Sequence, residues 1–493
     1  MNLKTAIMIT GGCTAAGTTA LQADENKKPN FVFLLVDDLG YGELGCFGSK
    51  FHETPNIDAL CSSGMIFTNA YSACCVCSPS RAAILTGQYP ARLHLTDWIP
   101  GHRRPYAKLA VPDWQMYIDN KLQILPQALE AGGYNNIFIG KWHLMPRGKK
   151  NTDADNHTPE AQGFMKNIAG CAMGAPRGQG KYFYPFGMPN LEGKKGDYLT
   201  DRLTDEAVKF IGTAGDKQFL LYMAYYAVHG PHMCKPEYKE YFQKKLADAP
   251  EGTYKQTDPV YAGMVRSLDE SVGRIVKALK DSGKFDNTVI FFTGDNGSTI
   301  HEGCGGLRGT KGTSYEGGTR EPTFIVWPGV VKPGSTCNIP IIGMDYYPTM
   351  MEIAGLPMKK EQACDGVSLV PLLKQTGKPD RDTLYWHYPH YHMTTPYSAV
   401  QHKGWKLIEF AEDGKLMLFN IENDPQETND LAASNPEKTQ KLQAMLHTWR
   451  NSVNAQMPAQ NPKYDTKKDH PLFAGKSGKK KKKNKKKKKN DTE

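Results

Sequence analysis

Four strongly apolar runs, each followed by a helical pattern, divide the chain. The runs are FVFLLV (31–36), NIFIG (136–140), FLLYMAYYAV (219–228) and TVIFFTG (288–294). Apolar runs of this kind are typical of strands buried on both faces of a sheet, and their alternation with helices is typical of parallel strands. The pattern therefore predicts an α/β domain built on a mostly parallel sheet.

Polar side chains capable of chemistry follow every one of these runs. In an open α/β sheet, ligands bind outside the carboxyl ends of the strands. A single residue of this kind is more often an ordinary loop residue, but four such positions in one chain predict one constructed site. In chain order the residues are Asp37 and Asp38, Lys141 and His143, His229, and Asp295 and Asn296.

The hydrophobic pattern is interrupted between about residues 355 and 380, where GLPMKKEQ and KQTGKPDRD occur. This break predicts a catalytic domain over residues 28–370 and a smaller α+β domain over residues 371–465. The stretch PEKTQKLQAMLHTWRNSV is typical of an amphipathic helix and would close the smaller domain.

Aromatic and histidine residues alternate in LYWHYPHYHM, residues 384–393. One interpretation is an edge strand with ordinary packing. The other is a loop that overhangs the pocket and stacks a sugar ring, because aromatic faces and imidazoles suit sugar rings and hydroxyls. In that case His390 would bind substrate, and Trp98 would line the same wall.

The amino terminus is typical of an export signal. Residues 1–23 contain a basic region at Lys4, a mildly apolar stretch and a plausible cleavage point after Ala23. A disordered tail is the alternative interpretation. Because no later segment reaches the ~18 to 20 consecutive apolar residues of a membrane span, we expect an exported protein, periplasmic or secreted, without a transmembrane segment.

Nearly all of the net charge lies at the carboxyl end. The chain of 493 residues carries a net charge of +10, of which +9 lies from Lys476 onward, where eleven lysines face Asp491 and Glu493. The remaining +1 leaves the folded body almost neutral, which disfavours a nucleic-acid enzyme. We expect residues 466–493 to form a disordered tail that either solubilises the protein or tethers a polyanion.

A cysteine lies at the expected start of a helix in CVCSPSRAAILTGQYP, residues 75–90. Pro79 suits a first helical turn and Ser78 can cap it, which places Cys77 just outside an amino terminus that attracts anions. Cys77 is close in sequence to Cys74 and Cys75, and mutual pairing of the three is sterically poor. The residues leave open an ordinary cysteine, a buried one, or a hydrolase nucleophile activated by a histidine.

The segment CSPSRAAILTG resembles the CxPSRxxxLTG signature of the formylglycine-dependent sulfatases, members of the alkaline phosphatase superfamily. Roughly residues 28 to 450 are similar to this family. The resemblance implies a large, mixed, mostly parallel sheet sandwiched by helices, with a smaller carboxy-terminal α+β subdomain. Further matching segments, in the family's order, are VDDLGYGELGCFG, TPNIDAL, GYNNIFIGKWH, HGP, TGDNG, LRGTKGTSYEGGTREP, DYYPTMMEIAG and LFNIENDPQETNDLA.

The resemblance implies that Cys77 does not act as a thiol. A formylglycine-generating or radical maturation enzyme would oxidise it to formylglycine (3-oxoalanine), and the hydrated aldehyde would provide two geminal hydroxyls. One hydroxyl would attack the sulfur of the ester, and the second, once deprotonated, would expel sulfate. Cys74 and Cys75 lack the proline and arginine at the required offsets.

The acidic residues and the resemblance to the family together imply a metal site. Asp37, Asp38, Asp295 and Asn296 offer only oxygen donors, which favours Ca²⁺ or Mg²⁺ over Zn²⁺. The family implies one Ca²⁺ per chain, with the modified Cys77 as a further ligand.

Fixed cations would meet the negative charge of a sulfate ester. Lys141 and Lys311 would bind the sulfate oxygens, and Arg81, one helical turn beyond the nucleophile, would hold the hydrated aldehyde. His143 would be the base that collapses the adduct. His229 would protonate the leaving alcohol, alone or with Lys311.

Two points stay open at this stage. His232 competes with His229 for the role of proton donor, although His229 directly precedes Gly-Pro at a strand end. The favoured function is an exported sulfatase acting on sulfated carbohydrates. The alternatives are a phosphonate or phosphodiester hydrolase with the same modified cysteine, and a sulfated-glycan-binding protein that has lost catalysis.

Overall fold

The structure is a computed structural model that describes residues 28–148 and 153–469. The predicted export signal (1–23) and residues 470–493 of the predicted lysine-rich tail lie outside these ranges. In the described ranges, no helix is both long and apolar enough to span a bilayer.

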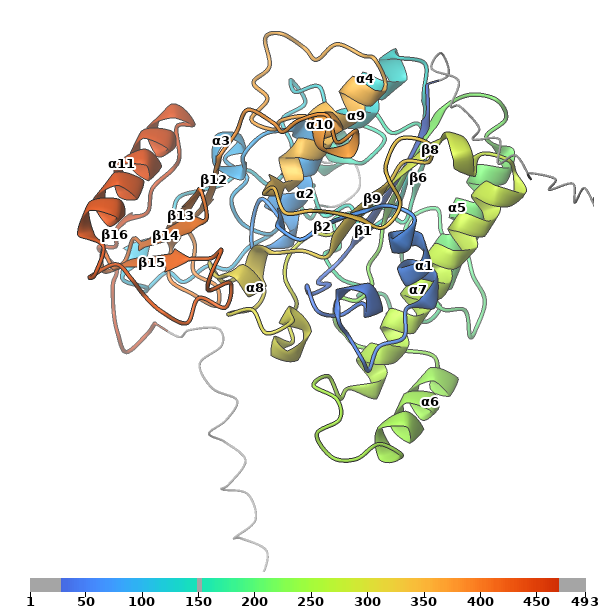
Figure 1. The fold of residues 1–493 in the computed structure, drawn as a ribbon, viewed down its shortest axis with the longest axis horizontal. Helices are drawn as coiled ribbons and strands as arrows, with labels where there is room; N and C mark the ends of the chain where they lie inside the picture. Colours follow the sequence, from blue (N-terminus) through green and yellow to red (C-terminus); the bar gives the residue numbers. More distant parts are fainter. Residues whose placement is uncertain (1–27, 149–152, 470–493) are drawn as a thin grey trace, which may run out of the picture.

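A mixed sheet forms the centre of the molecule (Figure 1). Its strands lie in the order β10-β2-β9-β8-β1-β7-β5-β6, and every neighbouring pair is parallel except the two pairs that contain β9. The predicted large, mostly parallel sheet is confirmed. The strands are β1 (Asn30–Val36), β2 (Met65–Phe67), β5 (Asn135–Gly140), β6 (Asn167–Ile168), β7 (Phe219–Ala224), β8 (Thr288–Gly294), β9 (Thr323–Val326) and β10 (Ser335–Cys337).

The four apolar runs are the four adjacent strands β8, β1, β7 and β5. Their ends coincide, since Val36 pairs with Gly294 and Gly140 pairs with Ala224. Strand β7 is shorter than the apolar run 219–228, because residues 225–228 leave the sheet and form backbone hydrogen bonds with the chain around Asp37. This turn brings the residues after β7 beside those after β1.

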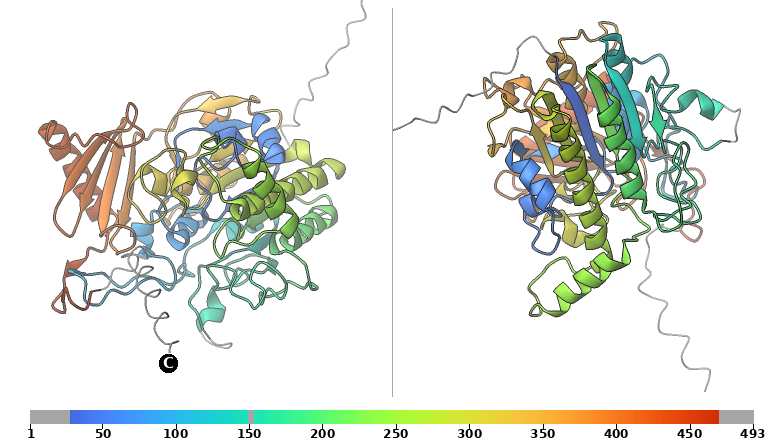
Figure 2. Two further views of the ribbon diagram at one scale, coloured as in Figure 1. Left: turned by 90° about the horizontal axis from the view of Figure 1, so that it is seen from below. Right: turned by 90° about the vertical axis from the view of Figure 1, so that its right-hand side faces the viewer.

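Successive residues of β1 point to opposite faces of the sheet, as the period of two in a strand requires. One set packs against α1, α5 and α7, and the other packs against α2, α4, α9 and α10. Figure 2 shows α5 and α7 lying across one face. The helices are α1 (Pro55–Ser62), α2 (Cys77–Thr86), α4 (Leu125–Ala131), α5 (Leu199–Thr213), α7 (Pro259–Asp281), α9 (Tyr346–Ile353) and α10 (Val370–Leu373).

A second, antiparallel sheet with one long helix lies beside the first domain (Figure 2). Its order is β12-β13-β14-β15, and its apolar residues pack between α11 and the chain that precedes α2. The predicted carboxy-terminal α+β subdomain is confirmed, while its exact boundary at residues 370/371 stays a prediction. The elements are β12 (Thr383–Tyr388), β13 (Tyr397–His402), β14 (Trp405–Phe410), β15 (Leu416–Asn420) and α11 (Pro436–Ser452).

Short elements complete the described chain. Strand β3 pairs with β11, and β4 pairs with β16. Helix α6 projects from the end of α7 in Figure 1. Their bounds are β3 (Ala70–Tyr71), β4 (Leu109–Ala110), β11 (Ile341–Ile342), β16 (Ala459–Gln460), α3 (Pro90–Leu93), α6 (Pro236–Ala247) and α8 (Glu316–Thr319).

Candidate active site

Helix α2 begins at Cys77 itself, with Val76 as its N-cap residue. The prediction that Ser78 caps this helix is wrong, because the Ser78 hydroxyl donates to the His143 carbonyl at 2.9 Å and accepts from the Ile99 N–H at 3.1 Å. Ser78 therefore joins three segments behind the helix terminus. Cys77 is buried, and its Sγ lies 3.1 Å from the Lys311 Nζ.

Arg81 and Lys141 form a fully buried cationic layer under Cys77. The Arg81 Nε donates to Asp295 Oδ2 at 2.9 Å, and its Nη1 donates to the Lys141 carbonyl at 2.7 Å. The Lys141 Nζ donates to both carboxylate oxygens of Asp37, at 2.9 and 2.7 Å. Because Arg81 is four residues beyond Cys77 on α2, the helix places its guanidinium on the same side as the thiol.

Asp37, Asp38, Asp295 and Asn296 form a buried cluster of oxygen donors at the ends of β1 and β8. The Asp38 N–H donates to Asp295 Oδ1 at 3.2 Å, and the Asn296 Nδ2 donates to Asp38 Oδ1 at 2.8 Å. In the described chain, Asp38 Oδ2 and Asn296 Oδ1 are buried without a hydrogen-bond partner. Unpartnered oxygens in an all-oxygen cluster fit Ca²⁺ or Mg²⁺ better than Zn²⁺.

The geometry also brings Cys77 to this cluster. A ligand atom from each of Asp37, Cys77 and Asp295 lies within 4.8 Å of the other two, and the same holds for Asp38, Cys77 and His229. Asp38 adopts a left-handed backbone with φ of 60°. Such a conformation is uncommon outside glycine and is concentrated at functional sites. All predicted metal-site residues therefore meet at one place, while their role as ligands stays a prediction.

Burial and charge set the protonation of this site. Burial raises the pKa of Asp37 to about 8, although Lys141 opposes the shift. Burial also disfavours the Asp38 carboxylate, but Lys311, His229 and Lys141 together lower the pKa of that group below its ordinary value. Burial raises the pKa of the Cys77 thiol to about 11 against the opposing effect of both lysines. The unmodified thiol is therefore a poor thiolate nucleophile near neutral pH.

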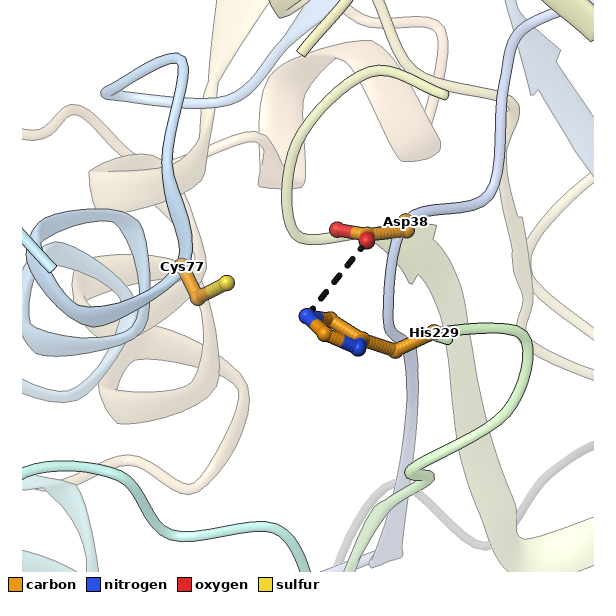
Figure 3. Close-up of side chains that lie close together, drawn as sticks. All are labelled: Asp38, Cys77 and His229. Carbon is orange, nitrogen blue, oxygen red and sulfur yellow. Dashed lines mark ion pairs between the residues drawn. The ribbon is translucent and has the colours of Figure 1, made fainter. Parts of the chain in front are cut away.

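His229 lies beside Asp38 and faces Cys77 across the site, as Figure 3 shows. Its Nε2 lies 3.7 Å from Asp38 Oδ2, and its Nδ1 lies 2.7 Å from the Gly230 carbonyl. His232 instead packs edge-on against Tyr261, with 5.1 Å between ring centroids, and lines a neighbouring cavity of about 320 Å³. Of the two histidines, the structure brings His229 to the site.

His143 also lies in the site but is more enclosed than the sequence suggests. Its Nε2 contacts the Ile99 carbonyl, its backbone is left-handed with φ of 57°, and burial holds its pKa well below 6.5. A Cβ on Gly174 would lie 2.4 Å from the ring, so glycine is required there. The role of His143 as a base stays a prediction.

The structure contradicts the expectation that His390 lines the pocket. Its side chain is fully buried, its Nε2 lies 2.8 Å from the Thr96 hydroxyl, and its ring packs edge-on against Trp114 and Tyr388. The preceding residues 383–388 are the edge strand β12, as the first interpretation predicted. His390 therefore belongs to the packing beneath the loop.

Two histidines that the sequence did not single out, His102 and His392, are partly exposed and lie next to the loop of Lys311. Their ring centroids are 5.6 Å apart, and the His392 ring lies against the backbone of Gly312, the residue after Lys311. The aromatic alternation in 384–393 indicated the correct segment, but the alternation of a strand ends at Tyr388 and does not extend to His392. No pattern in the sequence marked His102.

Two family models match the chain. The model described as Sulfatase matches residues 29–356, and the model described as N-sulphoglucosamine sulphohydrolase, C-terminal, matches residues 310–456. The first covers the large sheet and every predicted catalytic and metal-site residue. The second extends over the antiparallel subdomain.

Relatives and solved structures agree with these models. The chain is 31% identical to the uncharacterized sulfatase YdeN of Escherichia coli, covering 88% of this chain and 87% of that one. It is 34% identical to human N-acetylgalactosamine-6-sulfatase, covering 73% and 68%. The crystal structure of Ps i-CgsB in complex with k-i-k-neocarrahexaose is 29% identical and superposes with a TM-score of 0.71, covering 90% and 96%.

Proposed function

The chain belongs to the sulfatase family and is a sulfuric ester hydrolase, and on this premise we propose that it hydrolyses sulfate monoesters of carbohydrates. The nucleophile is the formylglycine made from Cys77, and Asp37, Asp38, Asp295 and Asn296, with the modified residue 77, would hold one Ca²⁺. The hydrated aldehyde supplies the attacking oxygen, and a bound cation would supply Lewis-acid polarisation of the ester.

The observation that carries the proposal is the convergence of opposite charges on one buried cysteine. Three aspartates, Arg81 and two lysines from five separate segments surround the Cys77 side chain, and the lysine Nζ of residue 311 touches its Sγ. Burying so many charges costs free energy unless each is paired. Such a cluster is typical of a site that binds both a cation and an anion.

Lys141 and Lys311 provide the positive charge that a sulfate group needs. Lys141 is fully buried and Lys311 is 11% exposed, and each is paired with an aspartate, so their positions are fixed before substrate arrives. A preorganised cation in a water-poor site stabilises developing negative charge without reorganisation. Arg81 holds the residue-77 side chain from below, since its guanidinium is fixed by Asp295 and by the Lys141 carbonyl.

His229 is the proton donor to the leaving alcohol. With its Nδ1–H donated to the Gly230 carbonyl, its Nε2 carries a lone pair that faces Asp38, so it donates a proton only as the imidazolium. Burial lowers the pKa of His229 to about 3, and a bound anion opposes that shift. Lys311, whose Nζ lies 3.1 Å from the Cys77 Sγ, shares the role, and His143 takes the proton that releases the sulfate.

A carbohydrate substrate is supported by relatives whose names or titles mention sugars. N-acetylgalactosamine-6-sulfatase and the complex of Ps i-CgsB with k-i-k-neocarrahexaose are examples. We further propose that the protein is exported, and that a formylglycine-generating or radical maturation enzyme is its partner. The proposal involves no nucleic acid.

Mass spectrometry combined with turnover tests the proposal. Protein produced with a maturation enzyme should carry an aldehyde or its hydrate at residue 77 and should cleave a sulfated sugar faster than a phosphodiester. Cys77→Ala should bind the sugar without cleaving it. A plain thiol at residue 77 in fully active enzyme would overturn the nucleophile, and faster cleavage of the phosphodiester would overturn the substrate class.

A further inference from the structure

We propose that His102, His392 and Trp98 form the site that binds the sugar ring of the substrate through its free hydroxyl groups. The inference rests on the proposed function, because it assigns the recognition of the leaving group at the same active site. The three residues are called the imidazole wall below.

The imidazole wall is a series of neighbouring rings that runs from His143 to the loop of Lys311. Trp98 lies 6.4 Å from the His143 ring, and His102 packs edge-on against Trp98 at 4.7 Å. His392 follows at 5.6 Å and rests on Gly312, beside Lys311. Since His143 and Lys311 both lie next to the nucleophile, a sulfate bound there would present its sugar to these rings.

The side chains of the imidazole wall are more exposed than the two histidines of β12 and the loop after it. Trp98, His102 and His392 are partly exposed, whereas His387 and His390 are buried in the subdomain packing. A Cβ on Gly312 would lie 2.0 Å from His392 Nδ1, so the loop that carries Lys311 accepts the imidazole only because residue 312 is glycine. The contact places His392 beside the loop that carries Lys311.

Buried anchors hold the two loops of the wall in place. The Asp97 carboxylate accepts hydrogen bonds from the Trp98 N–H at 2.9 Å, the His102 N–H at 3.4 Å and the Tyr388 hydroxyl at 2.6 Å. His390 and Thr96 add a second link between the same loops at 2.8 Å. The wall is therefore a preorganised surface that spans the catalytic domain and the carboxy-terminal subdomain.

The chemistry of the wall fits a sugar hydroxyl better than a second sulfate group. An imidazole ring offers one donor and one acceptor when neutral, which matches the two hydrogen-bonding roles of a hydroxyl. Burial lowers the pKa of both His102 and His392, and Lys311 adds to the effect at His392. The indole of Trp98 provides an apolar face for the ring carbons.

Kinetics with two substrates tests the wall. His392→Ala and His102→Ala in matured enzyme should each lower kcat/KM for a singly sulfated galactose or glucosamine about tenfold, mostly through KM, as expected for one lost hydrogen bond. The loss should be several times smaller for nitrophenyl sulfate, whose leaving group has no ring hydroxyl. His392→Asn, which keeps a donor and an acceptor, should recover part of the loss.

The exposed neighbour Met393 provides a matched control, since Met393→Ala changes the same loop without touching the wall. Calorimetric binding of the sulfated sugar to Cys77→Ala protein, with and without His392→Ala, reports on the wall even if turnover fails. Weaker binding in the double variant supports the inference. Equal binding, or equal losses of kcat/KM on both substrates, would overturn it, whereas unmodified residue 77 would overturn only the proposed nucleophile.

Discussion

The floor of the site, which consists of Asp37, Asp38, Arg81, Lys141 and Asp295, differs from the imidazole wall in how it is built. The floor around Cys77 consists of fully buried charges that stand at the ends of neighbouring parallel strands and at the start of α2. The wall consists of partly exposed rings on two loops, held by contacts between residues nearly 300 positions apart, such as Thr96 and His390. The difference suggests that the floor determines the reaction and that the wall selects the sugar.

Removing a proposed metal ligand should produce the largest effect and should lower the activity on every substrate. Asp295→Ala removes the carboxylate that accepts the hydrogen bond of the Arg81 Nε and removes an oxygen donor. For this reason kcat/KM should fall by about 10³-fold or more for sugar and aryl sulfates alike. Chelation of the wild type should do the same, and Ca²⁺ should restore activity better than Zn²⁺. Full activity in exhaustively chelated enzyme would show that the reaction does not require a bound cation.

Breaking the ion pairs that link the two domains should have the next largest effect, mainly on the free energy of unfolding. Lys406 of β14 is buried between Glu316 and Glu427, with its Nζ 2.8 and 3.0 Å from their carboxylates. Lys406→Met removes the cation that pairs with buried Glu427 and leaves Glu316 with Arg320, at 3.5 Å, as its ion-pair partner. This loss should cost about 3–5 kcal/mol in the free energy of unfolding.

Denaturant titration measures this effect, and the exposed Lys415 of the same subdomain supplies the control variant Lys415→Met. If the two variants unfold at the same denaturant concentration, the buried triad does not hold the subdomain in place.

Acid should lower the free energy of unfolding through His390, which supports the imidazole wall, and by a smaller amount than Lys406→Met does. Burial lowers the pKa of His390 from its ordinary 6.5 to about 3, so the unfolded chain binds a proton at this position more readily than the folded protein. The stability contributed above pH 6.5 is therefore lost as the pH falls toward 3. At pH 5 the loss should be about 2 kcal/mol.

Thermal unfolding of His390→Gln at pH 7 and pH 5 checks this sign. The variant should show a smaller drop between the two pH values than the wild type, while the exposed His301→Gln should behave like the wild type. A variant as sensitive to acid as the wild type would mean that other groups account for the loss.

The position of the floor residues could be predicted from the sequence, for a physical reason. Buried parallel strands leave a strong apolar signal, and the residues after β1, β5, β7 and β8 must meet at one sheet edge. The structure brings Asp37, Lys141, His229 and Asp295 together as expected.

The wall was predicted less well, because it depends on contacts that no local pattern records. His390 and His392 are two residues apart in one aromatic segment, yet the first packs inward against Trp114 and the second lies on Gly312. Where the chain leaves β12, the alternation that separates inward from outward residues stops applying. Ser78 failed as a predicted cap for a similar reason, since Ile99 and His143 engage its hydroxyl from distant segments.

The most direct test of the central claim is the mass of the residue-77 peptide of Cys77→Ser after incubation with a sulfated sugar. The single hydroxyl of this variant can attack sulfur, so a bond forms between its oxygen and sulfur while the bond to the sugar oxygen breaks and the sugar leaves as an alcohol. With no second hydroxyl on the same carbon, the sulfate ester should remain. The account predicts one added SO₃ group at residue 77. An unmodified residue 77, or SO₃ on another side chain, in a preparation whose matured wild type hydrolyses the same sugar, would contradict it.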